Sequence, residues 1–314
     1  MSDIQKCAIV GAGFVGSTCA YTLATSGLFS ELVLIDMNEK KARGEADDIS
    51  HGIAFAQPCR VVAGDYPDLA DCGLVIIAAG ANQKPGETRI DLLQRNRAIL
   101  SSILDSILAV NRDCVLLLVS NPVDILTYMA QKLSGLPPAR VLGSGTVLDT
   151  ARLKYLLGQR LHVDSRNVHA FIIGEHGDSE LAVWSSANIS GVDLPDYCRA
   201  TGQLLGPDTL DNVHREVRDA AYSIIEGKGA TYYGIGMAVL RIARAIVRDE
   251  HSVLPVTSLV TGHYGVSEVC LGLPTVVGRN GAEAVLDIPL SYAEQKQLLS
   301  SAGKLRGLLD EMQI

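Results

Sequence analysis

The sequence predicts an α/β protein in which a doubly wound parallel sheet is followed by a mixed α+β domain. Up to about residue 145, short and nearly continuous apolar runs alternate with helical stretches, which is typical of parallel strands buried on both faces. Beyond that point helical stretches dominate, and the remaining strand patterns are those of β-ribbons. We therefore expect two domains, residues 1–145 and 146–314, that meet at the glycines of LGSG.

In the first half, five strands and three helices are expected. The strands are KCAIV, ELVLID, CRVVAG, LVIIAAG and CVLLLVS, and the helices cover 14–26, 39–51 (with Asn38 as N-cap) and 89–110. In the second half we expect helices within 147–160 and 213–250, a strand at 168–173, β-ribbons within 253–288 with a turn at 279–281, and a last helix from Ser291.

Composition excludes several classes of protein. The chain has 314 residues, of which 47 % are apolar, and a formal charge of −8, so it has no general attraction to nucleic acids or anionic membranes. It contains no 18-residue apolar run, and it begins directly in a strand pattern rather than in a secretory signal. Its seven cysteines are scattered without a C-x-x-C, which favours buried, reduced thiols. We expect a cytoplasmic protein without a metal site.

A glycine-rich turn indicates a dinucleotide site. Gly11, Gly13 and Gly16 lie between a predicted strand and a predicted helix, where glycines allow a pyrophosphate to approach the helix N-terminus. The next strand ends in Asp36, whose carboxylate can accept hydrogen bonds from both ribose hydroxyls of NAD and would repel the phosphate of NADP. The alternative is that Asp36 only starts a helix. We therefore predict NAD as the cofactor, together with the Rossmann form of the doubly wound fold.

Two later strands end in residues suited to the other half of such a ligand. Gly80 and Ala81 follow one strand, and VSNPVD (119–124) ends another. Ligands of open α/β sheets bind at these carboxyl ends. The amide of Asn121 can hold the nicotinamide carboxamide or a substrate oxygen, although an asparagine before proline is also a common turn residue.

Three side chains suggest a reaction site. Asp149 and Arg152 are three residues apart in an apolar helical stretch, so they are either a surface ion pair or buried groups that need partners. His176, between glycines in GEHGDSE, is a candidate partner for the acid, and a bound carboxylate is a candidate partner for the arginine. The segment GANQKPGETRIDLLQRN (80–96) reads either as a lid that carries Gln83, Lys84 and Arg89 or as a solvated loop.

Seven motifs in this order resemble the L-lactate and malate dehydrogenase family, and among its members the bacterial NAD-dependent L-lactate dehydrogenases most. They are GAGFVGST, LIDMNEKKARGEADDISHG, GANQKPGETR, VSNPVDILTY, GSGTVLDTAR, IIGEHGDSE and KGATYYGIGMA, and they extend along essentially the whole chain. The resemblance implies reversible reduction of pyruvate to (S)-lactate by NADH in glycolytic fermentation.

The resemblance also implies roles for individual residues. His176 matches the proton donor and acceptor, Asp149 its carboxylate partner, and Arg152 the clamp for the substrate carboxylate. Arg89 matches the lid arginine that polarises the carbonyl. Further substrate contacts match Gln83, Asn121 and Thr231. The NAD contacts match Gly11, Gly13, Val15, Gly16, Asp36, Lys41, Tyr66, Gly80, Ala81, Ser102, Val119, Asn121 and Ser144.

Substrate choice is expected to depend on Gln83, because the malate branch of the family has arginine there. A neutral glutamine fits the methyl group of pyruvate, since burying the second carboxylate of oxaloacetate needs a fixed cation. Malate or a bulkier 2-hydroxy acid remains the alternative, and a non-catalytic NAD-binding or structural protein is a more remote one. The family further implies a homotetramer or dimer. Many bacterial members are activated allosterically by fructose 1,6-bisphosphate through a basic residue and a histidine, which match Lys154 and His169, although activated members more often have arginine at the first of these positions. His169 is otherwise an outward-facing strand residue or a subunit contact.

Overall fold

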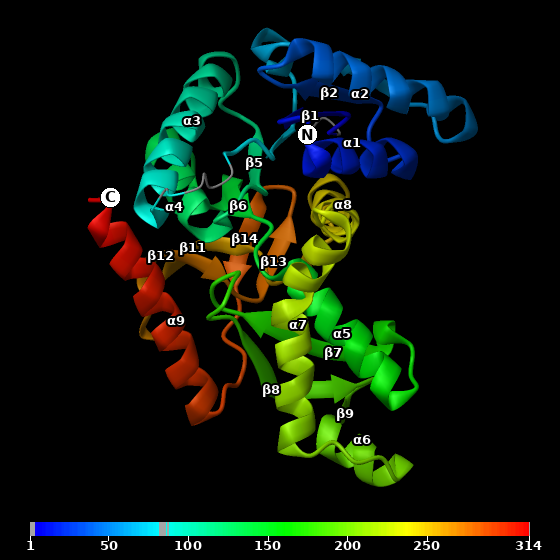
Figure 1. The fold of residues 1–314 in the computed structure, drawn as a ribbon, viewed down its shortest axis with the longest axis vertical. Coiled ribbons are helices and arrows are strands. Elements are labelled where there is room, and N and C mark those ends of the chain that lie inside the picture. Colours follow the sequence, from blue (N-terminus) through cyan, green and yellow to red (C-terminus); the bar gives the residue numbers. More distant parts are fainter. Residues whose placement is uncertain (1–3, 82–85, 87, 314) are drawn as a thin grey trace.

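A central eight-stranded sheet organises the chain in the computed structural model, which describes residues 4–81, 86 and 88–313 and leaves out the side chain of Arg89 (Figure 1). The strand order is β12-β11-β6-β5-β4-β1-β2-β3. The six strands of the first half run parallel, and β11 and β12 continue the sheet antiparallel beside β6. The strands are β1 (Lys6–Val10), β2 (Glu31–Ile35), β3 (Arg60–Ala63), β4 (Leu74–Ile77), β5 (Val115–Leu118), β6 (Val141–Gly143), β11 (Thr257–Thr261) and β12 (Ser267–Gly272).

Helices cover both faces of this sheet, as the prediction of a doubly wound fold requires. Successive residues of a strand point to opposite faces, so Ala8 and Val10 of β1 belong to one apolar cluster and Cys7 and Ile9 to the other. The first face is covered by α3 (Arg89–Val110), α4 (Val123–Ser134) and α9 (Tyr292–Glu311). The second is covered by α1 (Phe14–Ser26), α2 (Glu39–Gly52) and α8 (Tyr233–Val247). The predicted fold class is confirmed.

A third apolar cluster lies in the second half of the chain, below the main sheet in Figure 1. It joins one face of a three-stranded sheet to the helices that pack on it. Its elements are α5 (Val147–Leu161), β7 (Val168–Ile173), β8 (Leu181–Ile189), β9 (Val192–Asp193), α6 (Leu194–Thr201) and α7 (Pro207–Lys228). A further small sheet consists of β10 (Ser252–Leu254), β13 (Thr275–Gly278) and β14 (Gly281–Val285). Short 3₁₀ helices are η1 (Ile53–Phe55), η2 (Tyr66–Leu69), η3 (Pro138–Arg140), η4 (Ser165–Asn167) and η5 (His263–Gly265).

Most predicted elements are present. The helices expected within 213–250 are α7 and α8, and the chain leaves α7 at Gly229 in a left-handed conformation before it re-enters a helix at Tyr233. The β-ribbon with a turn at 279–281 is β13–β14, and Ser291 caps α9. All seven cysteines are buried and free, as predicted. Among the described residues, no helix has both the length and the apolarity to cross a membrane.

Candidate active site

The glycine turn between β1 and α1 is shaped for close approach of a ligand. Gly11 has φ +105°, and a Cβ there would lie 2.6 Å from the backbone nitrogen of Ala79. A Cβ on Gly16 would lie 1.7 Å from the carbonyl oxygen of Gly11, so the helix packs on the turn only with glycine at this position. Gly13 is the N-cap of α1, and no described side chain caps it. The first amide groups of α1 are therefore available to a pyrophosphate.

Asp36 stands where β2 ends, beside the glycine turn. Its carboxylate accepts hydrogen bonds from the backbone N–H of Ala12 at 2.8 Å and of Asn38 at 2.9 Å. These bonds hold Asp36 against the turn, and each carboxylate oxygen keeps further acceptor capacity for ribose hydroxyls. The cradle and this carboxylate fit an NAD molecule without a ribose phosphate.

Other expected cofactor residues follow the carboxyl ends of neighbouring strands. Ala81 follows β4, and its N–H donates to the side chain of Asn96 at 2.8 Å. Asn96 is only 2 % exposed and fixes the end of this strand, a role that the sequence did not reveal. The remaining residues are placed as follows: Val15 in the first turn of α1, Gly80 after β4, Val119 after β5, Ser144 after β6, Lys41 on α2, Tyr66 in η2, and Ser102 on α3.

The central feature of the reaction site is Asp149, which joins Arg152 to His176. Its Oδ1 accepts from Nη1 of Arg152 at 2.8 Å, and its Oδ2 lies 2.6 Å from Nδ1 of His176. Asp149 is 2 % exposed, so the pair with Arg152 is not a surface ion pair. The apolar residues around Asp149 in α5 bury it, as the pattern of this stretch indicated. Because Nδ1 faces the carboxylate, Nε2 is the ring atom left for a substrate.

Backbone contacts fix the turn that carries His176. Gly174 has φ +92°, a conformation that favours glycine. The backbone N–H of His176 donates to Asp124 on α4 at 2.7 Å, and the Thr257 hydroxyl of β11 donates to the other oxygen of Asp124. The backbone N–H of Glu175 donates to Ser301 on α9 at 2.9 Å. Three separate elements therefore hold the histidine in place.

The charges of this cluster favour a protonated histidine. Burial lowers the pKa of His176, but the charge and hydrogen bond of Asp149 outweigh burial and raise this pKa from 6.5 to about 9. Burial raises the pKa of Asp149, but the charges of His176 and Arg152 lower it by more, so the net shift is downward from 3.8. Burial also raises the pKa of Asp124, to about 6. Near neutral pH, His176 is therefore an imidazolium and Asp149 a carboxylate.

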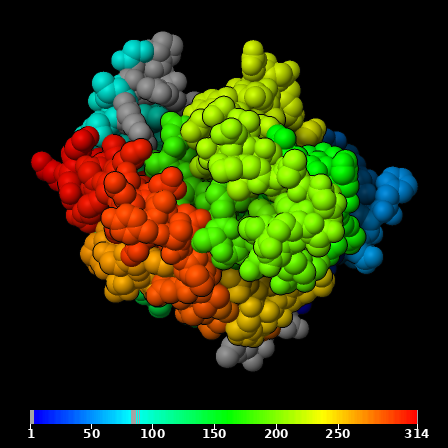
Figure 2. Space-filling view, turned by 90° about the horizontal axis from the view of Figure 1, so that it is seen from below, coloured from blue at the N-terminus to red at the C-terminus, as the bar shows by residue number. Residues whose placement is uncertain are grey.

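A cavity of about 730 Å³ opens in front of these groups. Asn121, Arg152 and His176 all line it, together with residues of α7 and α9. In the space-filling view, green residues lie between the orange-red C-terminal segment and the yellow-green segment that contains α7 (Figure 2). Thr231 lies in the connection between α7 and α8 and is not among the residues that line this cavity.

Several expected site residues are not placed by these contacts. Gln83 and Lys84 lie outside the described residues, and for Arg89 only the position at the start of α3 is described. Lys154 is half-buried on α5 and His169 is exposed on β7, an element that packs against α5. Burial lowers the pKa of Lys154, and so does the positive charge of Arg241 nearby.

Comparison with known proteins agrees with the fold. Residues 5–143 match the family described as lactate/malate dehydrogenase, NAD binding domain, and residues 146–313 match its alpha/beta C-terminal domain. An L-lactate dehydrogenase of Acetivibrio thermocellus is 53 % identical over 99 % of this chain and 98 % of its own length. One of a Thermoanaerobacter species is 51 % identical over 99 % and 100 %.

Two solved structures are similar along their full length. A lactate dehydrogenase from a Medee basin deep-sea metagenome library has a TM-score of 0.97 at 46 % identity and covers 100 % of both chains. A minor L-lactate dehydrogenase from Enterococcus mundtii has a TM-score of 0.95 at 42 % identity and covers 98 % of both. The nucleotide cradle and these matches define an NAD-dependent oxidoreductase. The chain belongs to the lactate/malate dehydrogenase family, so the resemblance drawn from its motifs is confirmed.

Proposed function

We propose that this protein is an L-lactate dehydrogenase that reversibly reduces pyruvate to (S)-lactate with NADH. The observation that carries the proposal is the placement of Asp149 between Arg152 and His176 at the wall of one cavity. This arrangement offers an anion clamp and a proton donor to the same small 2-oxo acid. The full-length similarity to proteins named L-lactate dehydrogenase supports the same substrate.

In this reaction NADH supplies the hydride to the carbonyl carbon of the substrate. His176 donates the proton that the carbonyl oxygen takes up, and Asp149 keeps the ring protonated until then. In the direction of lactate oxidation the neutral ring accepts the proton from the hydroxyl group. Arg152 binds the substrate carboxylate and so fixes the carbonyl carbon within the cavity.

The lid segment supplies the remaining roles. We assign to Arg89 the stabilisation of negative charge that grows on the carbonyl oxygen, an interaction that is stronger in the transition state than in the ground state. We assign to Gln83 the choice of a methyl group over a second carboxylate. Asn121 and Thr231 are proposed as further substrate contacts.

Initial rates of NADH oxidation with pyruvate and with oxaloacetate test the substrate. The enzyme should prefer pyruvate, and Gln83→Arg should shift the ratio of kcat/KM values toward oxaloacetate by at least about tenfold. Gln83→Glu is the matched control, because it changes charge in the opposite sense. A wild-type preference for oxaloacetate would assign the chain to the malate branch. If the protein binds NADH but turns over neither acid, then it is a non-catalytic NAD-binding protein.

The proposed cofactor preference depends on Asp36. NAD should be used better than NADP, since the carboxylate repels the ribose phosphate of NADP. Asp36→Ser should narrow the difference by at least about tenfold. Steady-state assays with both cofactors measure this ratio, and a wild type that prefers NADP contradicts the role of Asp36.

The proposals on regulation and assembly rest on family membership and on one cationic pair. Burial and the positive charge of Arg241 lower the pKa of Lys154, and an anion between subunits would relieve the repulsion between these two cations. We propose a cytoplasmic homotetramer in which fructose 1,6-bisphosphate binds at Lys154 and His169. Sedimentation of the native protein tests the assembly. Pyruvate saturation curves of the wild type and of Lys154→Gln, with and without the sugar bisphosphate, test the activator. If the sugar bisphosphate does not change the wild-type curve, then the proposed activation is wrong.

A further inference from the structure

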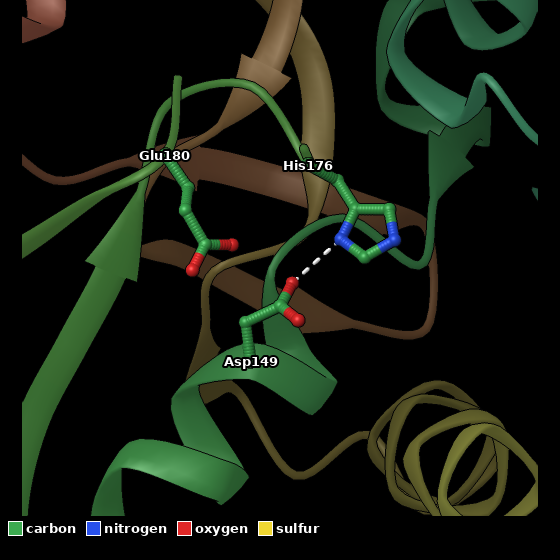
Figure 3. Close-up of side chains that lie close together, drawn as sticks. All are labelled: Asp149, His176 and Glu180. Atoms are coloured by element: carbon green, nitrogen blue, oxygen red, sulfur yellow. Dashed lines mark hydrogen bonds and ion pairs between the residues drawn. The ribbon is translucent and has the colours of Figure 1, made fainter. Parts of the chain in front are cut away.

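A second acid, Glu180, lies beside His176 in the lining of the same cavity and has no role in the mechanism above. Glu180 precedes β8 and is 6 % exposed. One oxygen atom each of Glu180 and Asp149 and a ring nitrogen of His176 all lie within 4.8 Å of one another. Figure 3 shows the Glu180 carboxyl group turned toward Asp149 and His176, with no hydrogen bond drawn to either.

The Glu180 carboxyl group is poorly solvated for a charged group. Its Oε1 is buried and has no hydrogen-bond partner among the described residues. The nearest cationic candidate on that side is Nε2 of His214 on α7, 3.9 Å away, which also is buried without a hydrogen bond. Burial lowers the pKa of His214, and so does the charge of Arg218, which makes His214 a poor counter-ion. Among the described residues, an ionised Glu180 would thus have no hydrogen-bonded counter-ion at this oxygen.

The groups that face Glu180 come from three elements. Asp149 and Arg152 face it from α5, His176 from the catalytic turn, and His214 and Arg218 from α7. Burial, followed by the charge of Asp149, raises the pKa of Glu180 from 4.5 to about 8, while the three cations His176, Arg152 and Arg218 reduce the rise. Glu180 therefore changes charge just above neutral pH.

The charge state of Glu180 changes the net charge of the cluster that Asp149, Arg152 and His176 form in the cavity wall. With Glu180 neutral, the carboxylate of Asp149, the imidazolium of His176 and the guanidinium of Arg152 leave a net single positive charge. This charge matches the single negative charge of pyruvate. Ionisation of Glu180 cancels this charge of the cluster and attracts the guanidinium of Arg152, so the clamp on the substrate carboxylate is weakened.

We propose that Glu180 is a positioning residue whose proton is required for tight binding of the substrate carboxylate at Arg152. It lines the same cavity as Arg152 and His176, and it acts through the charges of Arg152 and Asp149. The inference rests on the function proposed above, in which Arg152 clamps the carboxylate. Productive binding of pyruvate then requires two protons, one on His176 and one on Glu180.

The number of required protons can be counted from pH profiles of kcat/KM for pyruvate at saturating NADH. In the wild type the alkaline limb should be steeper than tenfold per pH unit and approach about a hundredfold, as expected for two protons. In Glu180→Gln, which keeps the neutral form at every pH, the limb should fall by only about tenfold per unit. Glu216→Gln, which removes an exposed acid of α7, is the control and should keep the wild-type slope.

Three outcomes overturn the proposal. The first is equal slopes in wild type and Glu180→Gln. The second is a loss of kcat/KM by one constant factor at all pH values, which marks a structural role only. The third is the absence of a protonated glutamate band at pH 7 in infrared spectra of wild-type protein labelled with ¹³C-glutamate. A protonated glutamate band should be present at pH 7, disappear by about pH 9, and return when oxamate, a non-reducible analogue of pyruvate, binds.

The infrared measurement does not depend on the folding of a variant. The label separates Glu180 from Asp124. Among the described residues the other buried glutamate is Glu294, whose pKa is lowered by hydrogen bonds from Ser185 and Ser291 despite burial, so it is ionised at pH 7. Absence of the band refutes the inference about Glu180 alone. Absence of any pyruvate turnover or oxamate binding in the wild type refutes the proposed function instead.

Discussion

Replacing Asp149 with asparagine tests whether this carboxylate acts through its charge. The variant keeps a side chain of nearly the same size but removes the group that raises the pKa of His176 from 6.5 to about 9. This rise corresponds to about 3 kcal/mol of differential free energy between the two protonation states. Since burial still lowers the pKa in the variant, His176 should titrate at or below its ordinary value.

The expected effect follows from the protonated fraction of the ring. At pH 7.5 this fraction should fall from nearly all molecules to about one tenth or less, so kcat/KM for pyruvate should fall at least about tenfold. At pH 5.5 most rings are protonated in both proteins, and the difference should shrink. Initial rates between pH 5.5 and 10 with pyruvate and saturating NADH measure the displacement of the alkaline limb.

A control and a refuting result complete this experiment. Asp196→Asn removes an exposed carboxylate of α6 that is paired with Arg199, and it should leave the profile unmoved. If Asp149→Asn loses the same factor at pH 5.5 as at pH 8.5, then its charge does not hold the proton on His176. Orientation of the ring would then be its whole contribution.

Further substitutions probe the same site and its supports. His176→Ala should keep NADH binding but lose at least about a thousandfold in kcat; activity within threefold of wild type rejects its role. Gly16→Ala should weaken NADH binding at least about tenfold by fluorescence titration, because its Cβ would lie 1.7 Å from the Gly11 carbonyl oxygen; unchanged affinity contradicts the cradle. Asp124→Ala leaves the Thr257 hydroxyl and the His176 N–H unpaired, so it should cost about 2–4 kcal/mol in urea unfolding and also lower kcat. Because the pKa of His176 is higher in the folded protein than in the unfolded chain, its proton adds stability that is fully present below pH 6.5 and is lost as the pH rises through about 9. Asp149→Asn should therefore flatten the dependence of the free energy of unfolding on pH between pH 7 and 9.

Local sequence patterns were sufficient for the parts of the fold that depend on local physics. Gly11 and Gly16 are recognisable because their positions tolerate no side chain, and Asn38 and Ser291 because a polar cap precedes each helix. The helices expected within 213–250 are confirmed, although the sequence did not place the break between α7 and α8. Its only local sign is Gly229, one glycine of a GKGAT stretch.

The supporting acids of the site were missed for a different reason. Asp124 holds the catalytic turn, but its partners His176 and Thr257 lie 52 and 133 residues away in the sequence. Glu180 is visible in GEHGDSE, yet its burial depends on α7, a helix contributed from beyond residue 206. Spacing alone cannot show that an acid will be enclosed by such distant elements.

The junction of β6 with β11 has a consequence for any attempt to divide this protein. Thr257 of β11 pairs with Gly143 and at the same time donates its hydroxyl to Asp124. A fragment that stops near residue 145 would expose the backbone of β6 along a bare edge, next to Val141 and Leu142, which are fully covered in the intact chain. Such a truncated piece would be prone to self-association through that edge, so the nucleotide-binding half needs strands translated more than a hundred residues later to finish its own sheet.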